Sequence, residues 1–202
     1  DPKSKAYKWY TKNGFKVISR IQSLEKKIQS FKSVKVNYRV LNTFQSFKKN
    51  SQTLSKVFND NFNNFDGYKK RSLNFWYNLK FHYYKHKCNY KIVILKAIDK
   101  NEYHYALVAK TKMRDKKFRL DILEFCSQSF KFRKLLLYAI ENFAKKNNCL
   151  ILRTQLSIMD KNKNFFVVNK FRNRWETNVM AKNLFKNYPS FKNFKYFQTE
   201  YI

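Results

Sequence analysis

The 202-residue sequence contains few residues that interrupt regular structure, with only two glycines and two prolines. AT-rich codon bias depletes both residue types, so their scarcity is one sign of an AT-rich genome. Acidic residues are also scarce: 13 Asp plus Glu stand against 44 Lys plus Arg, for a formal net charge of +31. Because so many like charges repel one another, the sequence disfavours a self-contained neutral enzyme and favours a polyanionic partner.

Cysteines are few as well, and the three lie far apart in the chain. An odd, widely spaced set predicts no disulfide framework, and Cys126 and Cys149 fit small core residues instead. No run approaches the roughly 20 apolar residues of a membrane span, and the opening residues show no signal-peptide pattern. We therefore expect a soluble protein of a reducing compartment. A start at Asp1 in place of Met predicts a processed or partly observed product.

Apolar residues are plentiful, at 44% of the chain, and 21 Phe and 14 Tyr contribute much of that area. This supply is ample for a buried core and excludes disorder of the whole chain. Lys, Asn, Phe, Tyr and Ile are favoured by AT-rich codons, which indicates an AT-rich genome, organellar or from a reduced organism. Codon bias therefore contributes to the charge, although Asn satisfies the same bias without adding any.

The first half of the chain gives mixed structural signals. Residues 1–13 lack periodicity and predict a basic arm with aromatic anchors. Residues 17–31 carry apolar positions at helical spacing, and residues 54–65 repeat that pattern. Residues 34–40 alternate as in a strand, whereas the aromatic and basic segment 68–90 gives no assignment.

The second half gives clearer signals. Strands are predicted at 90–98, 103–113, 118–125, 149–152 and 194–201, with helices at 130–146 and 162–170. The helix at 130–146 is a crossover, which favours parallel pairing of the strands on either side of it. We therefore predict an α/β (α+β) fold with a mixed central sheet and flanking helices. Residues 1–33 form a basic arm and N-terminal helix, and residues 34–202 form a single domain.

Three segments carry a family pattern. Residues 121–125 stand where a central strand runs, and residues 128–137 lie over a phosphate-binding motif, Arg/Gln-x-x-Gly-x-Gly, with a Leu-rich helix after it. Residues 165–171 lie over an ending of the form Phe-Tyr-x-x-x-Gly-Phe. In this order, the stretch from 90 to 171 resembles the GNAT family of N-acetyltransferases. The resemblance implies a GNAT-like sheet and acetyl-CoA as the family's cofactor.

The sequence departs from that family at four positions. Lys131 and Arg133 replace the two glycines that let backbone N–H groups approach a pyrophosphate. Phe166 replaces a tyrosine that often protonates the departing thiolate, and Lys170 replaces the last glycine. Glu124 stands where a family base can sit, but we expect it to pair with a nearby lysine. These departures predict a degenerate site, no enzyme activity, no catalytic residues and no cofactor.

One short run has ligand types suited to zinc: His82, His86 and Cys88. On a helix the two histidines share a face, but the cysteine points elsewhere. No further Cys or His nearby in the sequence completes a tetrahedral site, so we expect no metal.

Basic residues interleaved with aromatic residues form four clusters. Lysine and arginine neutralise phosphates, while aromatic and guanidinium planes stack on unpaired bases. RNA is favoured over DNA, and no DNA specificity is expected, because the chain has no recognition-helix, zinc-finger or basic-zipper signature. An anionic membrane surface ranks lower. The predicted RNA-binding residues are Lys3, Lys5, Lys8, Trp9, Lys12, Lys69, Lys70, Arg71, Trp76, Lys131, Arg133, Arg172, Arg174 and Trp175.

Together these features predict a structural, RNA-binding subunit of a large ribonucleoprotein. The favoured setting is a mitochondrial (organellar) ribosome in the mitochondrial matrix, with ribosomal RNA and neighbouring ribosomal proteins as partners. The first alternative is an active GNAT-type N-acetyltransferase that uses acetyl-CoA. The second is an accessory subunit of another organellar complex, which predicts acidic protein surfaces as neighbours in place of RNA.

Overall fold

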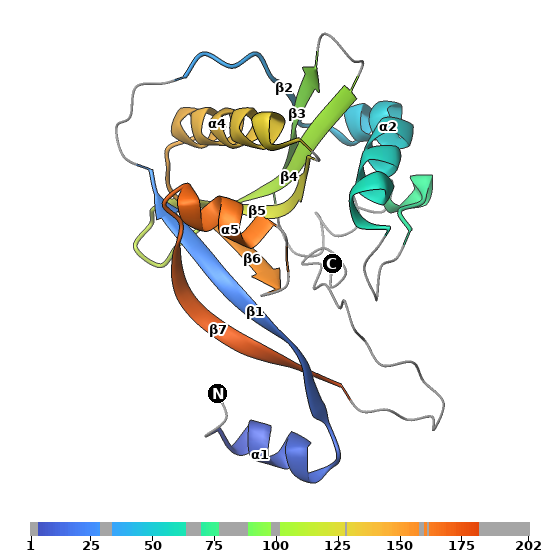
Figure 1. Cartoon of the computed structure of the whole chain (residues 1–202). Coiled ribbons are helices and arrows are strands. Elements are labelled where there is room, and N and C mark those ends of the chain that lie inside the picture. Colours follow the sequence, from blue (N-terminus) through green and yellow to red (C-terminus); the bar gives the residue numbers. More distant parts are fainter. Residues whose placement is uncertain are drawn as a thin grey trace. The chain divides into compact units, whose positions relative to one another are not determined.

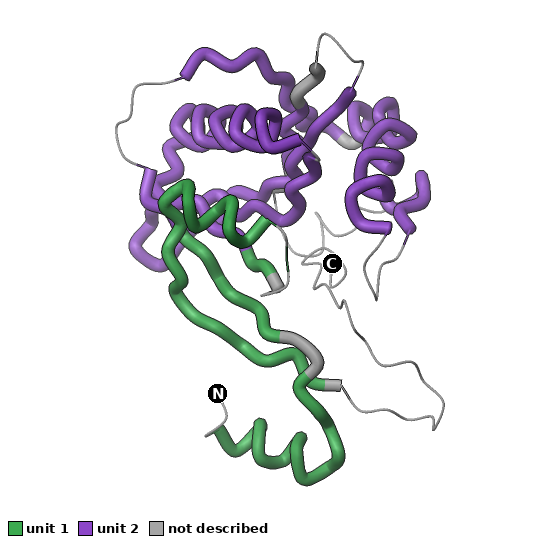
Figure 2. Tube along the Cα trace, in the orientation of Figure 1, with its two compact units in different colours: residues 1–25, 64–68, 155–196 green, residues 26–63, 69–154, 197–202 purple. Residues whose placement is uncertain are grey.

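The structure, a computed structural model, describes residues 4–28, 34–63, 70–76, 89–97, 102–127, 129–157, 160 and 162–181 (Figure 1). The chain divides into two compact units (Figure 2). Unit 1 comprises residues 1–25, 64–68 and 155–196, and unit 2 comprises residues 26–63, 69–154 and 197–202. The strand predicted at 194–201 lies outside the described residues.

Unit 2 is built on a mixed sheet with the strand order β2-β3-β4-β5-β6. The bounds are β2 Arg39–Leu41, β3 Asn89–Ala97, β4 Glu102–Lys112, β5 Phe118–Cys126 and β6 Cys149–Ser157. Neighbours from β2 to β5 pair antiparallel, whereas β5 and β6 pair parallel, which confirms the pairing expected across the crossover helix. The strands predicted at 90–98, 103–113 and 118–125 are confirmed. The strand predicted at 34–40 is confined to its last residues and extends to Leu41.

Helices cover both faces of this sheet. Helix α4 (Phe130–Lys146) contacts β3 and β4, and helix α2 (Phe44–Phe62) contacts β4 and β5. His104 on β4 stacks against Phe132 of α4, whereas its neighbour Tyr105 contacts Trp76, which is hydrogen-bonded to α2. Because successive strand residues point to opposite faces, α4 and α2 lie on opposite sides of the sheet.

Two features explain these helix bounds. The apolar stripe predicted for 130–146 is buried, and its bounds are confirmed. Helix α2 begins ten residues earlier than the pattern at 54–65 predicts, because a capping box starts it: Thr43 Oγ1 accepts from the Ser46 N–H, and Ser46 Oγ accepts from the Thr43 N–H, both at 3.2 Å. Phe47 in the first turn is buried, but the six residues that follow it, 48–53, are all polar, so the apolar pattern does not connect it with Leu54.

Unit 1 contains helix α1 (Lys5–Lys12), strand β1 (Lys16–Lys27), helix α5 (Asn162–Val168) and strand β7 (Arg172–Ala181). The two strands form an antiparallel ribbon, paired from Lys16 with Ala181 to Glu25 with Arg172. Within unit 2, the chain after β1 meets β6 through a 2.8 Å hydrogen bond from the Ile28 N–H to the Leu150 carbonyl.

Two predictions for the N-terminal region are wrong. Residues 5–12 form helix α1 where no periodicity predicts one, because Ser4 caps it: its Oγ accepts from the Tyr7 N–H at 3.1 Å. Residues 17–27 lie in strand β1 in place of the helix predicted at 17–31, because residues 16–25 pair with β7. Short apolar runs are ambiguous between helix and strand, and here a distant partner strand decides the outcome.

The central position of β4 leads to a stability prediction. Leu107 is fully buried between β3 and β5, so we expect Leu107→Ala to lower the free energy of unfolding by about 2–5 kcal/mol. Leu150→Ala is the matched control, because Leu150 is 46% exposed on β6 and its loss changes stability by only about 0.5 kcal/mol. Urea denaturation measures both. Equal effects would contradict the assigned core.

Candidate functional site

A buried carboxylate lies at the centre of unit 2. Glu124 on β5 accepts an ion-paired hydrogen bond from Arg71 Nη2 at 2.6 Å, with side-chain exposures of 2% and 3%. Its second oxygen accepts from the Tyr105 hydroxyl at 2.8 Å. Burial, reinforced by Cys126 and Glu124, raises the pKa of Tyr105 well above its usual value, so the phenol stays protonated as a donor. Glu124 is therefore held by a hydrogen bond on each of its oxygens.

Arg71 is held from several sides. Its guanidinium lies 3.6 Å from the ring centroid of Phe75 and 4.4 Å from that of Phe58. Its backbone N–H donates to Asn59 Oδ1 at 2.9 Å. The lysine partner expected for Glu124 is therefore wrong: an arginine 53 residues away in the sequence fills that role.

The prediction that Arg71 and Trp76 bind RNA is wrong, because both side chains are buried in the core. Arg71 is 4% exposed and Trp76 is fully buried, so neither side chain reaches the surface. Trp76 donates through Nε1 to Ser55 Oγ at 2.8 Å and contacts the ring of Tyr105 edge-on. These basic and aromatic side chains therefore pack in the core, where the guanidinium of Arg71 and the indole N–H of Trp76 each have a hydrogen-bond partner.

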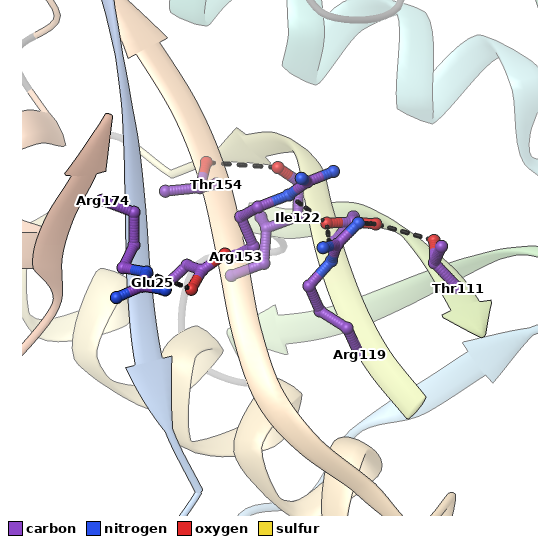
Figure 3. A network of polar contacts seen from close by, with 8 residues as sticks. Glu25, Thr111, Arg119, Ile122, Arg153, Thr154 and Arg174 are labelled. Carbon is purple, nitrogen blue, oxygen red and sulfur yellow. Dashed lines mark hydrogen bonds and ion pairs between the residues drawn. The ribbon is translucent and has the colours of Figure 1, made fainter. Parts of the chain in front are cut away.

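A second carboxylate, Asp121 on β5, is also neutralised within unit 2. Its Oδ1 accepts from Arg119 Nε at 2.9 Å and from Arg153 Nε at 2.6 Å, and its Oδ2 accepts from the Thr111 hydroxyl at 2.7 Å (Figure 3). Asp121 is 4% exposed. Both buried carboxylates of β5, Glu124 and Asp121, thus serve as counter-ions for arginine.

The start of α4 is the position of the family's phosphate loop. Its N-cap residue Ser129 makes no side-chain capping bond, and Lys131 is exposed in the first turn. The Arg133 side chain folds back onto the chain, because its Nε donates to the Ser127 carbonyl at 3.0 Å. Its backbone N–H donates to the Ser129 carbonyl at 2.9 Å, as in a regular first turn. A helix N-terminus with an added cation favours an anion, but the long side chains occupy the place of the family's glycines.

At the end of α5 the backbone forms the turn that the resemblance implies, and the side chains differ from the family pattern. Lys170, at the glycine position, has a φ of 69°, the left-handed region that glycine adopts most readily. The following N–H, of Phe171, donates to the Phe166 carbonyl at 3.1 Å and closes the turn. Phe166 is fully buried and packs edge-on against Phe171, so the tyrosine position holds no proton donor.

Unit 1 exposes two of the four basic and aromatic clusters. On α1, Lys5, Lys8 and Lys12 are exposed, and Trp9 is 59% exposed. On β7, Arg172 and Arg174 are exposed, and Trp175 is 42% exposed. Trp175 pairs with Ser23 on β1. Ser23 lies seven residues from Lys16, where β1 begins after α1, so the two clusters are about 24 Å apart along the strand at 3.4 Å per residue. The structure therefore brings two distant clusters into one unit, toward opposite ends of its ribbon.

Other predicted positions have simpler outcomes. Lys70 is exposed, whereas Lys3 and Lys69 lie outside the described residues. The run from His82 to Cys88 also lies outside them, and within the described ranges no group of three His, Cys, Asp or Glu side chains could hold a metal ion. Cys126 and Cys149 are buried, as expected for small core residues. No helix in the described part of the chain is long and apolar enough to span a membrane.

One notable residue, His104, was not a predicted site residue. It is 4% exposed and stacks on Phe132, with ring centroids 4.5 Å apart and planes 19° from parallel. Burial lowers the pKa of His104, against the opposing charge of Glu102. Its Nε2 has no hydrogen-bond partner among the residues that the structure describes. The alternation of side chains along β4 places His104 on the face that α4 covers. In the sequence, this alternation was the only indication that His104 is buried.

Comparison with known proteins identifies the fold but no close relative. No protein-family model and no curated protein matches the sequence. A GCN5-related N-acetyltransferase from Anabaena variabilis is similar in structure with a TM-score of 0.61 at 14% identity, over 88% of this chain and 43% of that one. A second, from Sphaerobacter thermophilus, gives a TM-score of 0.58 at 6% identity, over 87% and 55%.

A functionally unknown conserved protein from Staphylococcus epidermidis also matches, with a TM-score of 0.54 at 11% identity, over 90% of this chain and 68% of that one. The chain therefore has a GNAT-like mixed α/β fold, as its sequence pattern predicted. It spans about half the length of the two acetyltransferases. At these identities the likeness concerns the fold alone.

The buried ion pair leads to a stability prediction. Arg71→Met leaves Glu124 charged and buried without its partner, and we expect it to lower the free energy of unfolding by about 3–5 kcal/mol. Arg174→Met is the control, because Arg174 pairs with Glu25 at 3.2 Å while 67% exposed, and its loss costs at most about 1 kcal/mol. The double variant Arg71→Met with Glu124→Met recovers most of the loss. Additive losses in chemical denaturation would contradict a coupled pair.

Proposed function

We propose that this chain is a non-catalytic, RNA-binding domain built on a GNAT-like fold. We further propose that it is a structural subunit of a large ribonucleoprotein, with a mitochondrial ribosome in the matrix as its setting. The observation that carries this proposal is how the charge is distributed. In unit 2 the carboxylates of Glu124, Asp121 and Glu141 are bound to arginine or lysine, while basic residues beside exposed tryptophans lie on the surface of unit 1.

The first support is electrostatic. The chain carries a formal net charge of +31, and three of its 13 acidic residues, Glu124, Asp121 and Glu141, pair with basic residues inside unit 2. The third pair joins Lys26 Nζ to Glu141 at 2.6 Å. A polyanion relieves the remaining repulsion and releases its condensed counterions on binding. RNA supplies both the phosphates and the unpaired bases that exposed indole rings can stack on.

The second support is the state of the groups that acetyl transfer would use. Glu124 and Asp121 are fixed in ion pairs, and Phe166 cannot donate a proton. General acid–base catalysis needs a group whose proton can move at the reacting atom. The described residues at these positions offer none, so binding without turnover is the function that the geometry favours.

A second candidate function is acyl transfer from acetyl-CoA. It is favoured by the first turn of α4, where Ser129 leaves the helix without a side-chain cap and Lys131 adds an exposed cation. A diphosphate could bind there through backbone N–H groups and the lysine. The bulky side chains at the glycine positions argue against the close backbone approach that this binding needs.

Salt dependence tests the proposed function. In fluorescence anisotropy with a labelled single-stranded RNA, we expect the logarithm of the binding constant to fall linearly with the logarithm of salt concentration. Arg172→Gln with Arg174→Gln reduces the slope by about 1.4, at about 0.7 for each phosphate contact on a single strand. Lys49→Gln with Lys56→Gln, on exposed positions of α2, is the control that leaves the slope unchanged. A flat dependence, or no binding at low salt, contradicts the proposal.

Calorimetry with acetyl-CoA separates the two candidate functions. We expect no heat of binding, because Lys131 and Arg133 occupy the positions where the backbone must approach a pyrophosphate. Lys131→Glu is the matched variant, since its side chain is exposed and its loss does not disturb the core. Micromolar binding that Lys131→Glu weakens would overturn the non-catalytic assignment and favour the acyltransferase.

A further inference from the structure

Helix α1 is unusual because it buries none of its residues. Trp9 is 59% exposed and Tyr10 is 41% exposed, although aromatic side chains of this size supply most of their stabilisation through burial. Three lysines accompany them, at positions 5, 8 and 12. A helix that contributes little to the core and displays an indole beside cations is a candidate interaction surface.

The spacing of these residues puts them on one side of the helix. Lys5, Lys8 and Lys12 follow the i, i+3, i+7 pattern of a single helix face, and Trp9 stands four residues after the first of them and three before the last. At a rise of 1.5 Å per residue, the three lysines span about 10 Å along the axis. The indole is therefore flanked by positive charge at both ends.

The indole is also held in place by its neighbours. The edge of Tyr10 contacts Trp9, with ring centroids 5.2 Å apart and planes at 82°, and Phe15 braces Tyr10 in turn at 5.1 Å. At the end of α1, the Asn13 side chain donates to the Trp9 carbonyl at 2.8 Å. Gly14 then turns the chain into β1 with a φ of 81°. Such bracing reduces the entropy lost when a ligand stacks on the ring.

We propose that α1 is a base-stacking element, in which Trp9 stacks on an unpaired RNA base while Lys5, Lys8 and Lys12 contact the phosphates around it. This inference rests on the proposed RNA-binding function and deepens it: the ligand of α1 is single-stranded RNA. Bases in a duplex are already stacked, and the deep groove of A-form RNA does not admit an indole, so duplex RNA binds through its phosphates alone.

The same face argues against a lipid surface as the ligand. Helices that lie in a membrane interface separate a broad apolar face from a basic one. In α1 the largest apolar side chain, Trp9, borders the three lysines, so an indole among acyl chains would have ammonium groups close beside it. Stacking on a base leaves those groups beside phosphates.

Tryptophan fluorescence of the full chain tests this inference. In a Trp175→Phe background the emission comes from Trp9 and from Trp76, which is fully buried. The probes are a single-stranded RNA oligonucleotide, its duplex, inorganic polyphosphate, and vesicles of phosphatidylserine and phosphatidylcholine. We expect the single strand to quench Trp9 and to shield it from acrylamide, and we expect the duplex and polyphosphate to bind without doing so.

Variants in the same background give the affinity. Trp9→Ala lowers the affinity for the single strand about 5- to 100-fold, the effect of one lost base–aromatic stack, and leaves polyphosphate binding unchanged. Trp9→Phe retains part of the affinity, and circular dichroism checks that the fold is kept. RNA binding without quenching and without a Trp9→Ala effect overturns the role of α1 but not the proposed function. No RNA binding at low salt overturns the proposed function itself, and quenching by vesicles alone overturns the inference in favour of a lipid surface.

Discussion

Mutual repulsion among basic residues is the constraint on which the rest of this structure depends. With a formal net charge of +31 and only 13 acidic residues, the chain cannot neutralise its own charge. Several of these acidic residues form ion pairs inside unit 2. Glu124 holds Arg71 in the core, Asp121 joins arginines on neighbouring strands, and Glu141 holds the end of β1 through Lys26. An intact buried ion pair contributes little net stability, but removing one partner destabilises the fold strongly because the other charge stays buried. They leave the surface of unit 1 with a positive charge that an external anion can offset.

The backbone of this chain has the GNAT-like fold, and its side chains differ at several positions from the pattern that the sequence resembles. The crossover helix α4, the parallel pair β5–β6 and the left-handed turn at Lys170 all keep the architecture of the family. At the same time, the proton-donor position holds Phe166, and the carboxylate of Glu124 is bound by Arg71. One scaffold can host unrelated functions, so the residues carry more weight than the fold in assigning a role.

The sequence predicted the part of the fold that local patterns determine. Strands from 89 to 126 alternate or run apolar between clear turns, and α4 carries a full apolar stripe, so their types and bounds followed from the residues. Strand β1 was taken for a helix because its partner β7 is polar and lies some 150 residues away. The same limit applies to the site: the burial of Arg71 depends on Glu124, 53 residues away, which composition cannot reveal. The basic and aromatic residues of α1 and β7 lie at the surface, as their composition predicts, because exposure does not depend on a distant partner residue.

The central claim is that the surface charge is matched by RNA in the cell. Its most direct test is sedimentation of the protein from the cells that make it, before and after nuclease digestion. We predict that the protein sediments with RNA in a large particle and that digestion releases it as a small species. A protein that sediments alone as a monomer, unchanged by nuclease, would contradict this account.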